Sequence, residues 1–241
     1  MRRLTRASLS PGTVGYLSER TQQVLLAAEP KQEAARLWGS KSHEAFLEIR
    51  AALDLMASGL GRCMYCEDSR GTDIEHFWPK SAYPERTFHW DNYLLACGGC
   101  NSNHKRDQFP LDSAGSPLLI NPTAEEPRDH LLLMSSTGEY KYLTVKGERS
   151  IGVFHLNRVD LLGGRRNTWG AIQGLLVRYD QLCSRGDLSR ALLMQRTLCE
   201  YPFSSVFSYL LHVAETPDAA LLIDEDCLKV LDKYPDIKSW L

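Results

Sequence analysis

Hydrophobic residues recur at helical spacing in the first quarter of the chain. Phe46, Ile49, Leu53 and Met56 follow one another at intervals of three or four residues, which predicts an amphipathic helix over 42–56. Weaker spacing of the same kind predicts helices over 18–28 and 31–37. The residues before 17 are expected to be extended, with a turn at Pro11 and Gly12.

The rest of the chain changes its pattern twice. Apolar residues in 130–134 and 139–145 flank a Ser-Ser-Thr-Gly turn, which predicts a β-hairpin. From residue 157 onward the spacing is helical again, and Gly186, Pro202 and Pro217 divide it. The predicted helices there cover about 157–185, 187–201, 203–214 and 217–233.

These patterns predict an α+β protein that is mainly α. We expect it to form one compact unit with a small, loop-rich centre. Its four parts are an N-terminal helical region over 1–60, a central core over 61–110, a proline-rich connection with the hairpin over 111–150, and a C-terminal helical region over 151–241.

Composition narrows the class of protein. The chain has 241 residues, of which 43% are hydrophobic and 24% charged, as in ordinary globular proteins. Its apolar runs are too short to cross a bilayer and no secretory signal is visible, so we expect a cytoplasmic protein without membrane contact. The formal net charge of -2 does not indicate a nucleic-acid partner, so any such contact needs a local basic surface.

Four of the seven cysteines form two Cys-x-x-Cys pairs thirty residues apart, and the other three are isolated. The pairs are Cys63 with Cys66 and Cys97 with Cys100. Four thiolates in this spacing suit a tetrahedral zinc ion with Zn–S distances of about 2.3 Å and no open position, which is a structural site. Independent core cysteines and a redox pair are the alternatives, but no βαβ pattern surrounds either pair.

Polar residues that could bind a metal or take part in catalysis lie between and just after these pairs. Glu75 and His76 lie on a first predicted strand, Asn92 precedes a second strand, and Asn101 follows the last cysteine directly, on a predicted helix. This order resembles the HNH endonuclease family, whose ββα-metal fold is often stapled by zinc through two Cys-x-x-Cys pairs. The resemblance implies a metal-dependent nuclease core over 61–110.

The resemblance also implies a role for each residue. Glu75 matches the acidic ligand of a catalytic cation, His76 the general base, Asn92 the residue that orients the His76 ring or backbone, and Asn101 a second metal ligand. Hydrolysis of a phosphodiester needs an activated water and a cation at the phosphate. Carboxylate and amide oxygens suit a hard cation, so Mg²⁺ or Mn²⁺ is expected there in addition to structural Zn²⁺.

Several assignments at this site stay open. The third family position is usually His, and here it is Asn101, so His104 is an alternative ligand or a contact to the substrate phosphate. Lys105, one helical turn past Asn101, is the best phosphate contact. Asp73 shares a strand face with Glu75 and is either a ligand or a supporting group.

Further landmarks resemble the PtuB-like HNH effectors of Septu and Septu-type retron anti-phage systems. They are Arg62 to Glu67, Glu75 to Lys80, Phe109 to Leu111, Leu119 to Pro122, Pro127 to Leu131 and His155 to Arg158. The resemblance covers roughly residues 1–166. It implies a toxic nuclease that acts with a PtuA-type ABC ATPase and, in retrons, with a reverse transcriptase and its msDNA.

Three functions are compatible with these motifs. The first is an endonuclease acting on DNA, which we favour. The second is an RNase with the same site, perhaps directed at tRNA, because the motif handles the phosphodiester and not the sugar. The third is a zinc-stapled binding module without catalysis, which would not need Glu75, His76, Asn92 and Asn101.

Overall fold

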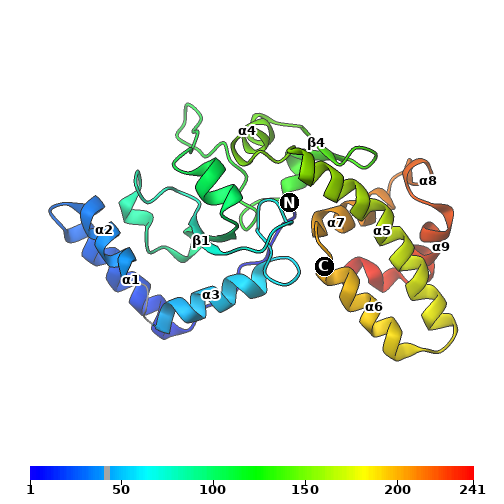
Figure 1. The fold of residues 1–241 in the computed structure, drawn as a ribbon. Coiled ribbons are helices and arrows are strands. Elements are labelled where there is room, and N and C mark those ends of the chain that lie inside the picture. The colour runs from blue at the N-terminus through cyan, green and yellow to red at the C-terminus, as the bar shows by residue number, and fades with distance from the viewer. Residues whose placement is uncertain (41–43) are drawn as a thin grey trace.

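The chain folds into three groups of elements that follow one another along the long axis of the molecule (Figure 1). The computed structural model describes residues 1–40 and 44–241. Helices α1 to α3 lie at one end, two β-hairpins and α4 lie in the middle, and α5 to α9 lie at the other end. The predicted class, α+β and mainly α, is confirmed.

The first helix begins earlier than predicted. Helix α1 covers Pro11–Leu26, where the sequence pattern indicated a turn and a start at residue 18. Proline is well suited to the first helical position, because its missing N–H would have no partner there. Ser10 caps the helix by accepting a hydrogen bond from Thr13 N at 3.3 Å. Pro11 therefore starts a helix instead of a turn.

The next two helices agree with the sequence pattern. Helix α2 covers Pro30–Gly39, and α3 covers Glu44–Met56 and buries the four apolar residues that predicted it. The predicted start of that helix, residues 42–43, lies outside the described residues.

The first hairpin carries most of the candidate site. Strand β1 (Asp73–His76) pairs antiparallel with β2 (Tyr93–Ala96), so that Asp73 lies opposite Ala96 and His76 lies opposite Tyr93. Short turns η1 (Pro84–Arg86) and η2 (Trp90–Asn92) lie in the connection, and the helical segment η3 (Gly99–Lys105) follows β2. Its turns are wide, since hydrogen bonds from Asn103 N to Gly98 O and from Arg106 N to Asn101 O each span five residues.

The second hairpin is present but shorter than expected. After η4 (Pro127–Asp129), β3 (Leu131–Met134) pairs with β4 (Glu139–Tyr142). The second strand does not reach residue 145, because Thr144 caps an unpredicted helix, α4 (Val145–Phe154), by accepting from Gly147 N at 3.2 Å. Gly147 lies so close to His130 O that an added Cβ would be 2.0 Å from it. Two glycines within ten residues lower the helix propensity of this segment, so the sequence pattern did not predict the helix.

The C-terminal helices match the predicted ranges within a few residues, except the last. They are α5 (Val159–Ser184), α6 (Leu188–Glu200), α7 (Ser204–Val213), α8 (Ala219–Leu222) and α9 (Glu225–Lys233), followed by η5 (Pro235–Ser239). The helix expected over 217–233 is two helices. It breaks where Asp224 N donates a hydrogen bond to Gln173 Oε1 of α5 at 2.7 Å.

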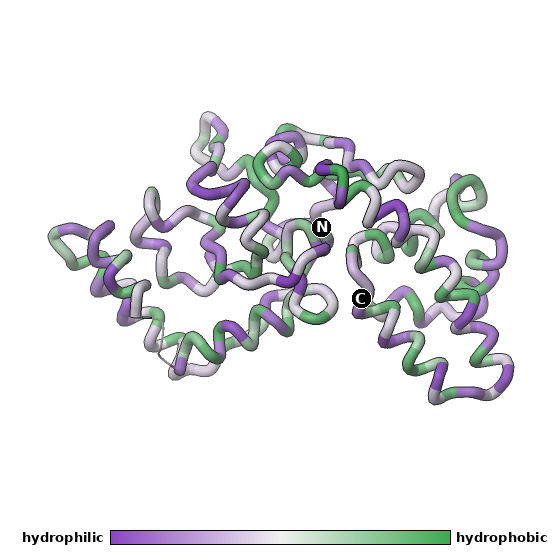
Figure 2. Tube along the Cα trace, in the orientation of Figure 1, coloured by the Kyte–Doolittle hydropathy of each residue, from purple (hydrophilic) through white to green (hydrophobic). Residues whose placement is uncertain are grey.

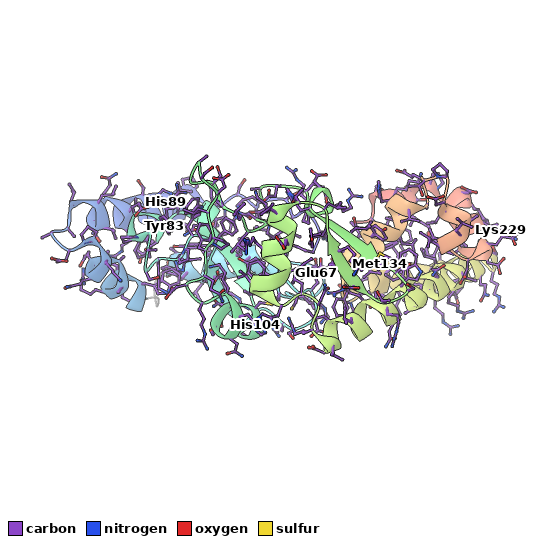
Figure 3. All side chains as sticks on the ribbon, turned by 90° about the horizontal axis from the view of Figure 1, so that it is seen from above. Glu67, Tyr83, His89, His104, Met134 and Lys229 are labelled. Carbon is purple, nitrogen blue, oxygen red and sulfur yellow. The ribbon has the colours of Figure 1, made fainter. Side chains whose placement is uncertain are left out.

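One polar cluster connects the cysteine-rich centre to the C-terminal helices. Glu67, directly after Cys66, is buried near the middle of the long axis (Figure 3). Its backbone carbonyl accepts from Phe203 N at 3.0 Å, and its carboxylate accepts from Ser205 N at 3.3 Å at the start of α7. The amino group of Met1 lies 3.0 Å from the same carboxylate.

The apolar core runs through all three groups, from Leu17 in α1 to Ile237 in η5. Hydrophobic and hydrophilic positions are interspersed along the helices (Figure 2). Across the described part of the chain, no helix is both long and apolar enough to cross a membrane.

Candidate metal centre and active site

The four predicted zinc cysteines meet at one point. The sulfur atoms of Cys63, Cys66, Cys97 and Cys100 all lie within 4.8 Å of one another, and all four residues are buried. The Sγ atoms of Cys66 and Cys97 are 3.8 Å apart. Four sulfurs about 2.3 Å from a central zinc ion would be about 3.8 Å apart in a regular tetrahedron. The cluster therefore has the size and chemistry for a closed structural zinc site.

Local backbone bonds hold both cysteine pairs in tight turns. In the first, Glu67 N donates to Cys63 O and Cys63 N donates to Ser69 O, each at 2.9 Å. In the second, Cys100 N points at Cys97 Sγ at 3.5 Å. Such turns aim backbone N–H groups at sulfur and thereby favour thiolates.

Arg158, at the start of α5, lies against this cluster. Burial lowers the pKa of its guanidinium, but the neighbouring sulfurs of Cys100 and Cys66 outweigh that effect and raise the pKa above its ordinary value. The guanidinium also hydrogen-bonds Cys66. A cation here partly offsets the negative charge of four thiolates. The sequence showed Arg158 only as the last residue of the landmark His155 to Arg158, because it lies 58 positions after Cys100.

The face of β1 that carries Asp73 and Glu75 packs against η3. Asn101 Nδ2 donates to Asp73 Oδ2 at 3.0 Å. Four residues further along η3, Lys105 Nζ lies 2.6 Å from Glu75 Oε1 and donates to His76 O at 2.9 Å. The structure thus brings Asn101 to one carboxylate and Lys105 to the other.

Lys105 does not occupy the place expected from the sequence. It was expected to contact a substrate phosphate, but its side chain is 1% exposed and that of Glu75 is 4% exposed. Burial raises the pKa of Glu75, while the charge of Lys105 acts in the opposite direction. The ammonium group therefore balances a buried carboxylate inside the fold. A helix-spacing argument could not show which residue of β1 it would meet.

His76 lies on the other face of β1, because successive side chains of a strand alternate. Its ring is buried, 4.3 Å from the Trp38 ring and 5.3 Å from the Tyr93 ring between centroids. Its Nε2 is 3.0 Å from Thr87 O. If Nε2 carries the proton of the neutral ring, Nδ1 is the nitrogen with the lone pair.

Asn92 acts on the loop between the strands and not directly on the His76 side chain. Its Oδ1 accepts from Trp78 N at 2.7 Å, and its Nδ2 donates to Trp78 O and Arg86 O at 3.1 and 3.0 Å. These bonds close the loop just before Thr87, whose carbonyl meets the His76 ring. The amide is therefore placed to position His76 through Thr87.

His104 and Asn101 contact different neighbours. Its ring stacks on that of His155, the last-turn cap of α4, at 4.3 Å and 20°. Burial, then the charges of His155 and Arg158, lower the pKa of His104. In Figure 3, His104 lies at the side of the molecule, on the helical segment next to α4. Of the two alternatives for a second ligand, Asn101 is the one that lies against a β1 carboxylate.

A pocket of about 430 Å³ opens beside Asp73 and Asn101. Its other lining residues are Trp38, Phe46, Leu47, Arg50, Thr72, Ile74 and Lys80. Asp73, Glu75 and Asn101 offer only hard oxygen ligands, as Mg²⁺ and Mn²⁺ prefer. Within residues 1–40 and 44–241, the cysteine cluster is the one group of three or more His, Cys, Asp or Glu side chains close enough to share an ion.

The fold and the site together define a class of protein. In this class, a β-hairpin and a short helical segment are joined by a four-cysteine cluster that could hold zinc. No protein-family model matches the chain. It is 32% identical over 146 residues to a Septu protein PtuB of Bacillus thuringiensis, across 58% of this chain and 51% of that protein. It is 35% identical over 132 residues to a Septu protein PtuB of Bacillus mycoides strain KBAB4, across 42% of this chain and 44% of that protein.

The predicted resemblance to PtuB is therefore confirmed, and the chain is PtuB-like. It covers about half the length of the curated relatives that it matches.

Proposed function

We propose that this protein is a metal-dependent HNH endonuclease that hydrolyses nucleic-acid phosphodiester bonds. One observation carries the proposal. The segment that follows the second cysteine pair brings Asn101 against Asp73, on the same strand face as Glu75 and beside an open pocket. A purely structural zinc site needs none of these three residues.

Asp73 and Asn101, which line the pocket, would hold Mg²⁺ or Mn²⁺. Glu75 would join them as a ligand only by giving up its contact with Lys105. Such an ion supplies positive charge at the scissile phosphate and the leaving oxygen. His76 would act as the general base that accepts the proton of the attacking water, the role that its place directly after Glu75 in the motif implies. Asn92 would keep the Thr87 carbonyl beside His76 in place through its bonds to the loop.

The relatives support a biological setting for this activity. Both are named as Septu proteins, so we propose that the chain serves a Septu-type anti-phage system. A PtuA-type ABC ATPase is then its expected partner, and a reverse transcriptase with msDNA would join it in a retron. DNA is the favoured substrate and RNA is the alternative.

The test is to incubate the purified protein with plasmid DNA and, separately, with total tRNA in Mg²⁺ or Mn²⁺. Cleavage should fall at least about 100-fold in His76→Ala and in Asn101→Ala, while zinc content and the circular dichroism spectrum stay unchanged. His89→Ala is the matched control, because His89 is exposed and lies in the connection between β1 and β2. Cleavage of tRNA alone would replace DNA by RNA as the substrate. Full activity in both site variants would rule out the proposed catalytic site.

A further inference from the structure

The pocket beside Asp73 and Asn101 is lined by two chemically different sets of residues. The polar set, called the polar side here, comprises Asp73, Asn101, Lys80, Arg50 and Thr72. The apolar set, called the apolar side, comprises Phe46, Leu47, Trp38 and Ile74. Its volume of about 430 Å³ is within the usual range for small-ligand sites and is ample for one nucleoside.

Lys80 is the cation that is available on the polar side. It is exposed, and among the residues that the structure describes it has no hydrogen bond or ion pair. Arg50 lines the same pocket, but its guanidinium donates to Gly71 O at 2.6 Å and to Thr72 O at 2.8 Å, and pairs with Asp54. A phosphate at this site would therefore meet Lys80 and not Arg50.

The apolar side offers a surface for a flat ring. Leu47 projects from α3, is 72% exposed and lines the pocket. Behind it, the rings of Trp38 and Phe46 pack edge to face at 5.3 Å. Nucleobases gain affinity on apolar and aromatic side chains of this kind, largely without regard to sequence.

A base can enter this pocket only when it is not paired and stacked in a helix. A duplex shields the base faces, and extraction of a paired base costs a few kcal/mol. A loop, an overhang or a single strand exposes its bases without that cost. The pocket adjoins Asp73 and Asn101, so a base seated there belongs to a nucleotide next to the phosphodiester to be cut.

We propose that this pocket binds one unpaired nucleotide, with its phosphate at Lys80 and its base against Leu47, and thereby directs cleavage to unpaired segments. The proposal rests on the nuclease function proposed above. It names a substrate feature that the motif residues do not specify, and it applies equally to DNA and RNA.

The cleavage test uses four oligonucleotides of one sequence: single-stranded and duplex, each as DNA and as RNA. For whichever sugar is cut, the single strand should be cleaved at least about tenfold faster than the duplex. Leu47→Asp should reduce this cleavage about tenfold. Leu55→Asp is the matched control, because Leu55 is 82% exposed on the same helix and does not line the pocket.

A second measurement separates binding from catalysis. Fluorescence anisotropy with a labelled single strand, in buffer without Mg²⁺ or Mn²⁺ and without a chelator, should show weaker binding by Leu47→Asp than by Leu55→Asp. Lys80→Ala should raise KM more than it lowers kcat and flatten the salt dependence of binding, whereas Lys31→Ala on α2 should do neither.

The outcomes distinguish the two proposals. If the wild-type protein cleaves nothing but binds single strands through Leu47, the nuclease function fails and the pocket assignment stands. If cleavage is present but equal on single strands and duplexes, or if Leu47→Asp and Leu55→Asp behave alike in both measurements, the pocket assignment is wrong.

Discussion

Lys105 and Glu75 illustrate how a buried charge pair can shape a site without touching substrate. Their contact at 2.6 Å joins η3 to β1, and Lys105 also holds the carbonyl of His76. Both side chains are almost completely inaccessible, so each charge depends on the other for its solvation. The pair holds η3 against the face of β1 that carries Asp73 and Glu75.

Replacing Lys105 by methionine should lower the free energy of unfolding by about 3–5 kcal/mol, because Glu75 is left buried without a counter-charge. Urea denaturation measures the change. Lys141→Met, which removes an exposed pair with Glu139, should cost less than about 1 kcal/mol. If both variants unfold at the same urea concentration, the buried pair does not stabilise the fold.

Residue spacing predicted the cysteine cluster but not its neighbours. The two-residue spacing within each Cys-x-x-Cys pair suits the ligands of one metal ion, so the approach of the two pairs to each other could be predicted from the sequence. The places of Lys105 and Arg158 could not, because each depends on a contact with a different element. Asn101 and His104 are three residues apart, and only the wide turns of η3 decide that one faces Asp73 and the other His155.

At the scale of elements, long periodic helices were predictable and short or glycine-containing ones were not. Helix α3 and the C-terminal helices showed a clear apolar stripe. Helix α4 contains two glycines and begins shortly after β4, so the sequence pattern predicted its first residue as a continuation of the strand. The break between α8 and α9 depends on Gln173, which lies 51 residues away.

The contact between α5 and α9 gives a pH-dependent term in stability. Asp180 accepts hydrogen bonds from Lys233 and from Tyr234 Oη, and the Lys233 bond is the main reason why the pKa of Asp180 is lowered. A carboxyl group with a lower pKa in the folded state stabilises the protein above its unfolded-state pKa of about 4. That contribution is lost as the pH falls toward and through the folded-state pKa.

Asp180→Asn should therefore lower the free energy of unfolding by about 0.5–1 kcal/mol at pH 7. The difference from wild type should shrink between pH 5 and pH 3. Thermal or urea unfolding across this range measures it, with Asp232→Asn, an exposed aspartate of α9, as the control. A difference that stays constant with pH would show that the bond contributes through packing and not through charge.

At the scale of the whole molecule, Glu67 joins the metal centre to the C-terminal helices. It follows Cys66 directly, and its carboxylate accepts hydrogen bonds from Ser204 and Ser205 at the start of α7. The sequence showed Glu67 only as one residue of a motif, because its partners lie more than 130 residues away. The link explains how a small metal site and a helical region share one core.

Replacing Glu67 by alanine should lower the free energy of unfolding by about 3–5 kcal/mol, since it removes a buried carboxylate that contacts Ser204, Ser205 and the amino group of Met1 and leaves these polar groups without their partner. Limited proteolysis should then cut between α6 and α7 sooner than in the wild type. Glu126→Ala, which removes a partly exposed pair with Arg128, is the control. An unchanged proteolysis pattern would mean that the apolar core alone holds the C-terminal helices.

The position of the cysteine cluster gives the β1–β2 hairpin one stiff end and one compliant end. Cys97 follows Ala96 directly, and Thr72 N donates to Ala96 O at this end. At the opposite end, a sixteen-residue connection over 77–92 is closed by the side chain of Asn92 and carries no metal ligand of the cluster. Backbone amides should thus exchange with deuterium more slowly beside Ala96 than beyond His76. Removal of a bound metal ion should therefore speed exchange first beside Ala96, whereas the opposite end depends on the bonds of Asn92 and on the contact between Lys105 and the His76 carbonyl.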